Sequence, residues 1–266
     1  MSSKMSIPPL KRTGFSGSKS SLRSIGWSEV LSMKCRSPIV PALIYILVVS
    51  LFLAATYWGS AAISVIAQKI PLPRQNTVII DAGHGGVDGG ATSCTGKLES
   101  AFNLEIALRL NDLMHLMGIH TVMIRTTDIS VYTKGETIAA KKVSDLMERA
   151  RIVNETENAL LLSIHQNTFS DSKYSGAQVF YGKKGEGQAL ASQLQTAMVL
   201  SINPGSNRKS KPAESVYLME HIEATGVLIE CGFLSNTQEE AKLRSAEYQK
   251  QLCCVIAATV SNFLDR

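Results

Sequence analysis

The chain has 266 residues, of which 45% are apolar, and this is enough for one sizeable hydrophobic core. The net charge of +5 is concentrated in residues 1–37, which hold seven basic side chains and one acid, Glu29. The remainder is close to neutral, so the main support for nucleic-acid binding is absent and we expect no nucleic-acid partner.

Residues 39–67 contain no charged side chain, and this stretch exceeds the ~20 residues that a helix needs to cross a bilayer. A basic segment before such a span favours a cytoplasmic N-terminus, with the rest of the chain outside. We interpret residues 1–38 as a basic, disordered cytoplasmic tail, 39–67 as an uncleaved transmembrane signal anchor and 68–76 as a linker. Cleavage after the small residues that precede Gln68 is the alternative.

The rest of the chain, residues 77–266, alternates strand-like and helix-like segments. Short apolar or β-branched runs predict strands at 77–81, 120–125, 159–165, 175–182, 213–220 and 225–233. Amphipathic periodicity predicts helices at 98–118, 144–156, 186–202 and 237–264, the last broken near 246–248. Strands separated by helices of this length indicate an α/β sandwich with a mainly parallel sheet.

Three predicted strands end in residues capable of metal or acid–base chemistry, and these residues are His84, His165 and Glu230. Glu99 opens the first long helix of the same region. The carboxyl ends of neighbouring parallel strands meet at one edge, so we expect these side chains to converge. Two histidines and a carboxylate suit a hydrolytic zinc site, which needs a second carboxylate to move protons. We predict His84, Glu99 and His165 as Zn²⁺ ligands, with Glu230 as general base and then acid.

Other residues beside these strands are candidates for supporting roles. Asp81 and Asn167 could orient an imidazole or hold the substrate amide. The four candidate residues also have ordinary interpretations, since a histidine after a strand can be a loop residue and Glu99 can simply favour the helix dipole. Glu230 is harder to explain in this way, because a carboxylate between apolar residues of a strand should be nearly buried.

The five cysteines show no metal-binding pattern, because no two have the C-x-x-C spacing. Cys253 and Cys254 lie in an apolar helical pattern, where free buried thiols are common. Cys231 could be a nucleophile, but no Asn–His pair is placed locally to activate it. The disulfide state of Cys94 and of these three cysteines stays open.

The chain resembles the zinc-dependent N-acetylmuramoyl-L-alanine amidases of bacterial cell walls (amidase type 3) over residues 77–264. The resemblance rests on Glu99 and on five segments in order: IIDAGHGGVDGGA, RTTD, RARIVN, LLLSIHQN and LIECGFLSN. It implies a twisted six-stranded sheet flanked by helices, similar to zinc carboxypeptidases and phosphorylases. It also implies cleavage of the amide between N-acetylmuramic acid and L-alanine, with the ligands at His84, Glu99 and His165 and the catalytic carboxylate at Glu230.

Within this family, a short chain with one N-terminal span and no cell-wall-binding repeats is similar to the CwlD-type, germination-specific amidases. These enzymes strip peptides from the spore cortex so that a separate deacetylase can help form muramic δ-lactam. The resemblance therefore implies peptidoglycan as substrate, the forespore intermembrane space as location and a deacetylase as cooperating enzyme, and it leaves room for an activator protein. A zinc peptidase acting within the stem peptide and a catalytically silent, membrane-anchored peptidoglycan-binding protein stay open as alternatives.

Overall fold

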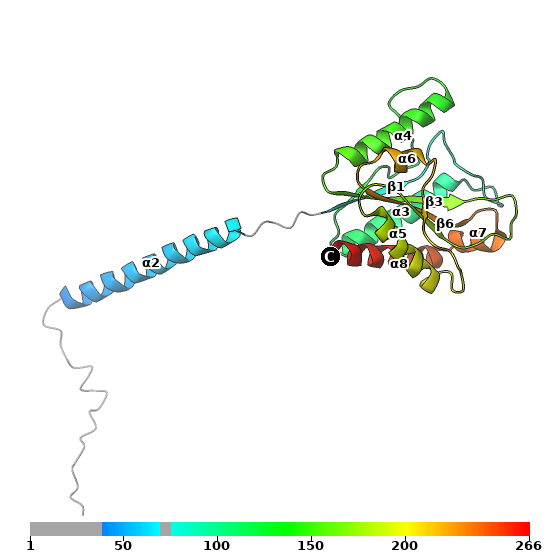
Figure 1. Ribbon diagram of the computed structural model, residues 1–266. Coiled ribbons are helices and arrows are strands. Elements are labelled where there is room, and N and C mark those ends of the chain that lie inside the picture. The colour runs from blue at the N-terminus through cyan, green and yellow to red at the C-terminus, as the bar shows by residue number, and fades with distance from the viewer. Residues whose placement is uncertain (1–38, 70–75) are drawn as a thin grey trace, which may run out of the picture. The chain divides into compact units, whose positions relative to one another are not determined.

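The computed structural model describes residues 39–69 and 76–266, and the chain divides into two compact units, Met1–Ile70 and Pro71–Arg266 (Figure 1). The predicted tail, residues 1–38, and residues 70–75 of the predicted linker lie outside the described ranges. Each unit is therefore considered by itself.

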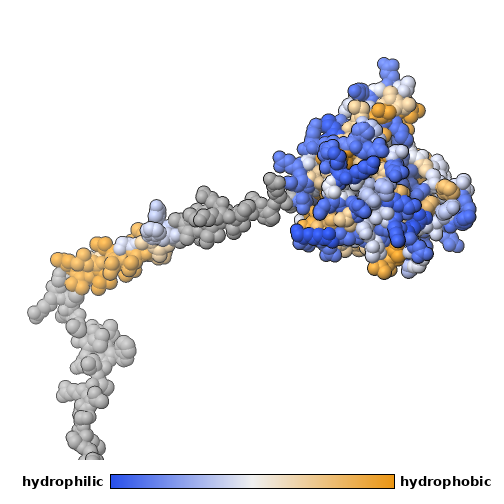
Figure 2. All heavy atoms as spheres, in the orientation of Figure 1, coloured by the Kyte–Doolittle hydropathy of each residue, from blue (hydrophilic) through white to orange (hydrophobic). Residues whose placement is uncertain are grey.

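Helix α2 (Ile39–Lys69) is the described element of the first unit. Its stretch Ile39–Trp58 has a mean hydropathy of 2.5 and none of it is buried, so it is long and apolar enough to cross a membrane. Figure 2 shows this stretch as largely hydrophobic, whereas the visible surface of the second unit is mostly hydrophilic. A signal sequence has the same properties, so the uncleaved anchor stays a prediction.

The second unit is built on a mostly parallel sheet, in which residues 76–266 form six strands in the order β2-β1-β3-β6-β4-β5. These strands are β1 (Thr77–Ala82), β2 (Thr121–Met123), β3 (Ala159–Asn167), β4 (Gln178–Tyr181), β5 (Lys211–Pro212) and β6 (Thr225–Phe233). Every neighbouring pair is parallel except β4 and β6, which run antiparallel. The predicted α/β fold with a mainly parallel sheet is confirmed.

Helices cover both faces of this sheet (Figure 1). The helices are α3 (Glu99–Leu116), α4 (Ile138–Glu155), α5 (Gly187–Ser201), α6 (Tyr217–His221), α7 (Thr237–Arg244) and α8 (Ala246–Leu264). The larger core lies between the sheet and α3, α5 and α8, and a smaller one lies under α4 and α6. Because both faces are covered, the central strands are continuous apolar runs and not alternating ones.

The central strands are therefore rigidly held. Val78, Ile79 and Ile80 of β1 have no exposed surface, and neither do Leu161 and Leu162 of β3. Burial of each such side chain contributes about 1.5–3 kcal/mol relative to exposure. The polar residues that follow these runs are consequently fixed at the carboxyl edge of the sheet.

One predicted strand is wrong. Residues 213–220 do not form a strand; Tyr217–His221 is α6, and the fifth strand lies just before, at Lys211–Pro212. Within α6 the buried side chains are Leu218 and Met219, and with the buried Ile222 that follows the helix they have the spacing of one helical face. The short apolar run at 216–219 fits a strand or a turn of helix equally well.

Two helix boundaries also differ from the sequence prediction. Helix α4 begins at Ile138 and not at Ser144, because the Thr137 side chain accepts a hydrogen bond from Ala140 N at 3.2 Å and caps the helix. The predicted break in the C-terminal helix lies at Ser245, just before the expected interval, and separates α7 from α8.

Candidate metal centre and active site

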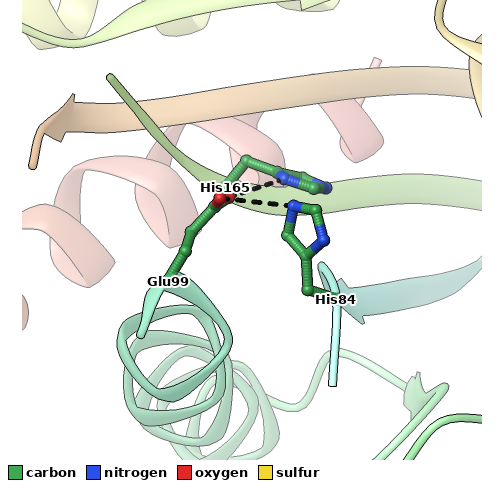
Figure 3. A group of neighbouring side chains, drawn as sticks. All are labelled: His84, Glu99 and His165. Carbon is green, nitrogen blue, oxygen red and sulfur yellow. Dashed lines mark hydrogen bonds and ion pairs between the residues drawn. The ribbon is translucent and has the colours of Figure 1, made fainter. Parts of the chain in front are cut away.

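The structure brings His84, Glu99 and His165 together at the carboxyl edge of β1 and β3 (Figure 3). One potential ligand atom from each residue lies within 4.8 Å of the other two. Glu99 spans the two imidazoles, with Oε1 at 3.0 Å from His165 Nδ1 and Oε2 at 3.3 Å from His84 Nε2. Nitrogen and carboxylate ligands of Zn²⁺ lie about 2 Å from the ion, so the spacing of this group is compatible with one metal ion held by all three residues.

The loop after β1 fixes the orientation of His84. His84 has φ 60°, in the left-handed region that residues other than glycine rarely adopt. Its Nδ1 lies 2.8 Å from Asp88 Oδ2, so Nε2 is the nitrogen that faces Glu99. Carboxylates commonly hold metal-binding histidines in this way. Asp88 was not predicted from the sequence, although its spacing from His84 within a glycine-rich turn offered a signal.

Glu99 is held as a carboxylate by many donors. It is 4% exposed and accepts hydrogen bonds from Ala91 N at 3.0 Å, Gln166 N at 3.2 Å and Asn103 Nδ2 at 3.3 Å. Burial by itself raises the pKa of Glu99, but hydrogen bonds from His165 and His84 and their charges hold this pKa well below its usual range. Its charged form is therefore available to bind a cation.

Glu230 lies on the strand next to His165 and is paired with it in the register of β3 and β6. Its Oε2 is buried and has no hydrogen-bond partner among the described residues. Burial raises the pKa of Glu230 to about 7; the charge of Glu99 adds to the rise, while His165 and His84 oppose it. A carboxyl group of this pKa can both accept and donate a proton near neutral pH, as a general base and acid must.

Arg125 joins the two segments that carry His84 and Glu99. Its side chain is 2% exposed, and it donates to Ala82 O at 2.8 Å, Gly83 O at 3.0 Å and Ser100 O at 2.9 Å. The first two carbonyls directly precede His84, and the third directly follows Glu99. This guanidinium therefore fixes the main chain of both segments at once.

Arg149 supports the same loop from helix α4. It forms buried ion pairs with Asp81 and with Asp145, and it donates to His84 O at 2.8 Å. Asp81 also accepts from Ser163 Oγ at 2.7 Å. Burial by itself raises the pKa of Asp81, but Arg149 and the other partners lower it overall. Asp81 thus acts on the His84 main chain through Arg149.

The remaining predicted residues are placed as follows. Asn167 is half-buried at the end of β3, two residues beyond His165. Cys231 is a free, buried thiol whose pKa burial raises well above its usual range, which disfavours a nucleophilic role. Cys94 and Cys254 are exposed and Cys253 is buried; no disulfide links these four cysteines of the described part.

These features define the class of the protein. A parallel sheet carries at its carboxyl edge a His–Glu–His group that could hold a metal ion, with a carboxyl group of pKa about 7 on the next strand. This arrangement is that of a hydrolase. Residues 78–262 match the N-acetylmuramoyl-L-alanine amidase family, and the chain belongs to it. The protein is an N-acetylmuramoyl-L-alanine amidase that acts on peptidoglycan.

Named relatives agree with this assignment. The germination-specific N-acetylmuramoyl-L-alanine amidase of Bacillus subtilis (strain 168) is 36% identical over 189 residues, covering 70% of this chain and 78% of that protein. The CwlD amidase of Clostridioides difficile, solved in complex with the GerS lipoprotein, is 34% identical with a TM-score of 0.68, covering 71% of this chain and 98% of that one. An N-acetylmuramoyl-L-alanine amidase from Clostridium difficile 630 is 29% identical with a TM-score of 0.61, covering 71% and 97%.

Proposed function

We propose that the protein is a zinc-dependent amidase in which His84, Glu99 and His165 hold Zn²⁺ and Glu230 moves the protons. The observation that carries this proposal is the proximity of a three-ligand group to a carboxyl group of pKa about 7 on the adjacent strand. Neighbouring strands lie about 4.8 Å apart, so Glu230 is within reach of groups bound at the cluster.

Zinc, when bound, supplies a more acidic water and polarises the substrate carbonyl. Glu230 can then accept a proton from the attacking water at Oε2, the oxygen without a hydrogen-bond partner in the described part. The same carboxyl group passes the proton to the amide nitrogen of L-alanine as the C–N bond breaks. The products are a free lactyl carboxylate on N-acetylmuramic acid and a stem peptide with a free amino group.

Other residues around the cluster keep the ligands in position during this reaction. Asp88 fixes the tautomer of His84, and Asn103 donates both to Glu99 Oε1 and to Gly83 O. Gln166 donates to Asn103 Oδ1 at 3.2 Å. These hydrogen bonds hold the three ligands in one arrangement before a metal ion binds, so less conformational entropy is lost on binding.

We further propose a role in the spore cortex, supported by similarity to a germination-specific amidase and to the CwlD amidase. Peptide removal there would precede formation of muramic δ-lactam with a cooperating deacetylase. The complex of the CwlD amidase with a lipoprotein supports an activator protein as a partner. The apolar stretch Ile39–Trp58 supports membrane anchoring, with the catalytic unit, residues 77–266, in the forespore intermembrane space.

The proposal can be tested on the full-length protein in detergent. The protein is incubated with peptidoglycan with and without a zinc chelator, and the released fragments are analysed by mass spectrometry. We expect free stem peptides that begin at L-alanine, released only when zinc is present. Release that persists in the chelator would overturn the role of zinc, and fragments cut within the stem peptide would indicate a zinc peptidase.

A further inference from the structure

We propose that three aromatic residues beside the catalytic centre, Phe169, Tyr174 and Phe233, bind the glycan strand of peptidoglycan. We call these residues the aromatic platform. This inference rests on the proposed function, because the platform would hold sugar units next to the muramic acid that is cleaved. Its basis is the geometry of the rings, their position at the end of β6 and in the segment after β3, and the cations that flank them.

The three rings of the platform form one edge-to-face pair and one stacked pair. Phe169 and Tyr174 have ring centroids 4.7 Å apart at 76°, and Tyr174 and Phe233 have centroids 6.3 Å apart at 28°. Phe233 is 4% exposed, whereas Tyr174 is 40% and Phe169 is 53% exposed. The inner ring, Phe233, therefore packs against Tyr174, which in turn contacts Phe169, and the two outer rings keep much of their apolar surface in water. Such exposed apolar surface next to a catalytic centre is typical of a binding site.

The platform continues the strands that carry the catalytic residues. Phe233 is the register partner of Asn167, on the same two strands that pair Glu230 with His165. A strand rises about 3.3 Å per residue, so Phe233 lies roughly 10 Å beyond Glu230 along β6. This separation suits sugar units that neighbour the reacting one on the same glycan strand.

Two cations flank the platform. The Arg208 guanidinium lies 5.2 Å from the centroid of the Phe233 ring, and Lys173 Nζ lies 5.5 Å from that of Tyr174. Arg208 also donates to Gln178 Oε1 at 3.3 Å, and Gln178 is the partner of Glu230 in β4. Arg208 thus contacts both Phe233 of the platform and Gln178, the β4 residue paired with Glu230.

Aromatic rings and cations together complement the chemistry of peptidoglycan. The C–H groups of a sugar ring are apolar and slightly positive, so they pack on the negative face of an aromatic ring. The stem peptides carry carboxylates, which the Arg208 guanidinium can attract, whereas Lys173 Nζ already pairs with Asp171 Oδ2 at 2.7 Å. A chain of sugar rings that bears acidic peptides as branches matches both the rings and the arginine of this surface.

The segment that bears the outer rings is held in place by polar contacts. Phe169 N donates to Ser235 Oγ at 3.1 Å, and Gly176 N donates to Glu239 Oε2 at 2.7 Å. Next to this segment lies a hollow of about 610 Å³ with a polar lining that includes Lys173 and Asn203. A surface that is ordered before binding loses little conformational entropy on binding, and the polar hollow offers partners for sugar hydroxyl and amide groups.

The test compares full-length wild-type protein with Phe169→Ala and Tyr174→Ala on two substrates. One substrate is intact peptidoglycan with long glycan strands, and the other is a soluble muramyl peptide without neighbouring sugars. We expect each variant to raise KM for the long strands about three- to tenfold, with kcat unchanged and with unchanged turnover of the muramyl peptide. Phe169→Tyr should restore KM. Leu200→Ala is the matched control, because Leu200 is an apolar side chain with 74% exposure on α5.

Co-sedimentation with intact peptidoglycan measures binding without turnover. Weaker sedimentation of Phe169→Ala than of Leu200→Ala supports the platform, and equal sedimentation with an unchanged KM overturns it. An equal loss on both substrates would also overturn it, because the rings would then act on the catalytic geometry. If the wild-type protein binds peptidoglycan but releases no peptide, the proposed amidase mechanism fails and the sedimentation result still decides the platform.

Discussion

Glu99 and Glu230 lie at the same edge of the sheet, on α3 and β6, but their surroundings are opposite. Glu99 receives hydrogen bonds from two main-chain amides, one side-chain amide and both imidazoles, and these partners hold its pKa low. Glu230 has an oxygen with no partner in the described part of the chain, and its pKa is about 7. Burial raises the pKa in both cases, so the hydrogen-bond donors decide which carboxyl group stays charged.

The difference extends to the segments that bear the two residues. The main chain around His84 and Glu99 is fixed by Arg125 and Arg149, which are both buried. A metal ligand needs a fixed position and a permanent charge, whereas an acid–base residue needs an exchangeable proton. The segments that bear His84 and Glu99 suit the proposed metal ligands, and the end of β6 suits the proposed acid–base residue, at one edge of the sheet.

The largest effect is expected from removal of a ligand. His165→Ala should abolish stoichiometric zinc binding and peptide release, because two ligands alone do not form a zinc site. Metal analysis of the purified protein measures this directly. His221→Ala is the control, since His221 is exposed and outside the cluster. Unchanged zinc content in His165→Ala would remove His165 from the ligand set.

Glu230→Gln should affect turnover without affecting zinc binding, and so distinguish the role of Glu230 from that of the ligands. The amide keeps the size of the side chain but cannot accept the proton, so kcat should fall by about 10²–10⁴-fold. Zinc content should be unchanged, because the ligands and their hydrogen bonds are untouched. Steady-state kinetics and metal analysis on the same preparation provide both values. Near-normal turnover would show that another group moves the proton.

Arg125→Met tests whether the ligand region depends on its fixed main chain. Loss of the guanidinium leaves the carbonyls of Ala82, Gly83 and Ser100 without this donor, and zinc affinity should fall by about 10–100-fold. Competition with a chromophoric chelator measures the affinity, and circular dichroism reports whether the fold is kept.

Two further arginine variants are controls for the zinc affinity of Arg125→Met. Arg125→Lys keeps the charge but cannot reach all the carbonyls, so its zinc affinity should lie between those of Arg125→Met and the wild type. Arg151→Met, at an exposed position on the same helix as Arg149, should leave zinc affinity unchanged. Equal zinc affinity in Arg125→Met and Arg151→Met would show that zinc binding does not need the hydrogen bonds from Arg125 to the two segments.

The smallest effect concerns stability and pH in the metal-free protein. The pKa of Glu230 is about 7 in the folded chain against an ordinary 4.5, so its contribution to stability is present below pH 4.5 and is lost as pH rises through 7. Glu230→Gln should therefore be more stable than wild type at pH 9, by about 1–2 kcal/mol, and similar to it near pH 4.

Glu99→Gln should behave in the opposite way. The pKa of Glu99 is lowered by folding, so its contribution to stability is present above its ordinary pKa of 4.5 and is lost as pH falls through the folded value. The variant should lose stability at neutral pH. Urea unfolding at several pH values measures both variants, and parallel curves for the two would contradict the assigned difference between the carboxyl groups.

The four central residues could be predicted because each follows a feature that is visible in the sequence. His84, His165 and Glu230 lie at or near the ends of long apolar runs, and such runs in parallel strands end at a common edge. Glu99 begins an amphipathic helix. The fold follows from the same pattern, since buried strands and helices alternate along the chain.

The supporting residues could not be predicted because their contacts depend on how loops and helices pack. Asn103 reaches Gly83 only because α3 lies against the end of β1, and Arg125 reaches Ser100 across the same junction. The sequence singled out RTTD and RARIVN as motifs without showing what they do. The strand at 213–220 was predicted wrongly because a short apolar run cannot by itself distinguish a strand from a single turn of helix.

Strand β6 lies in the middle of the sheet, between β3 and β4, but comes near the end of the chain. During synthesis the chain carries His84, Glu99 and His165 long before Glu230 exists, and β3 has no partner on that side until β6 is made. A nascent or truncated chain that ends before β6 therefore has the three predicted metal ligands but lacks Glu230, and β3 has no partner strand on that side. We expect such a chain to be unable to cleave the amide, so that activity begins only once the last strand of the sheet has been added.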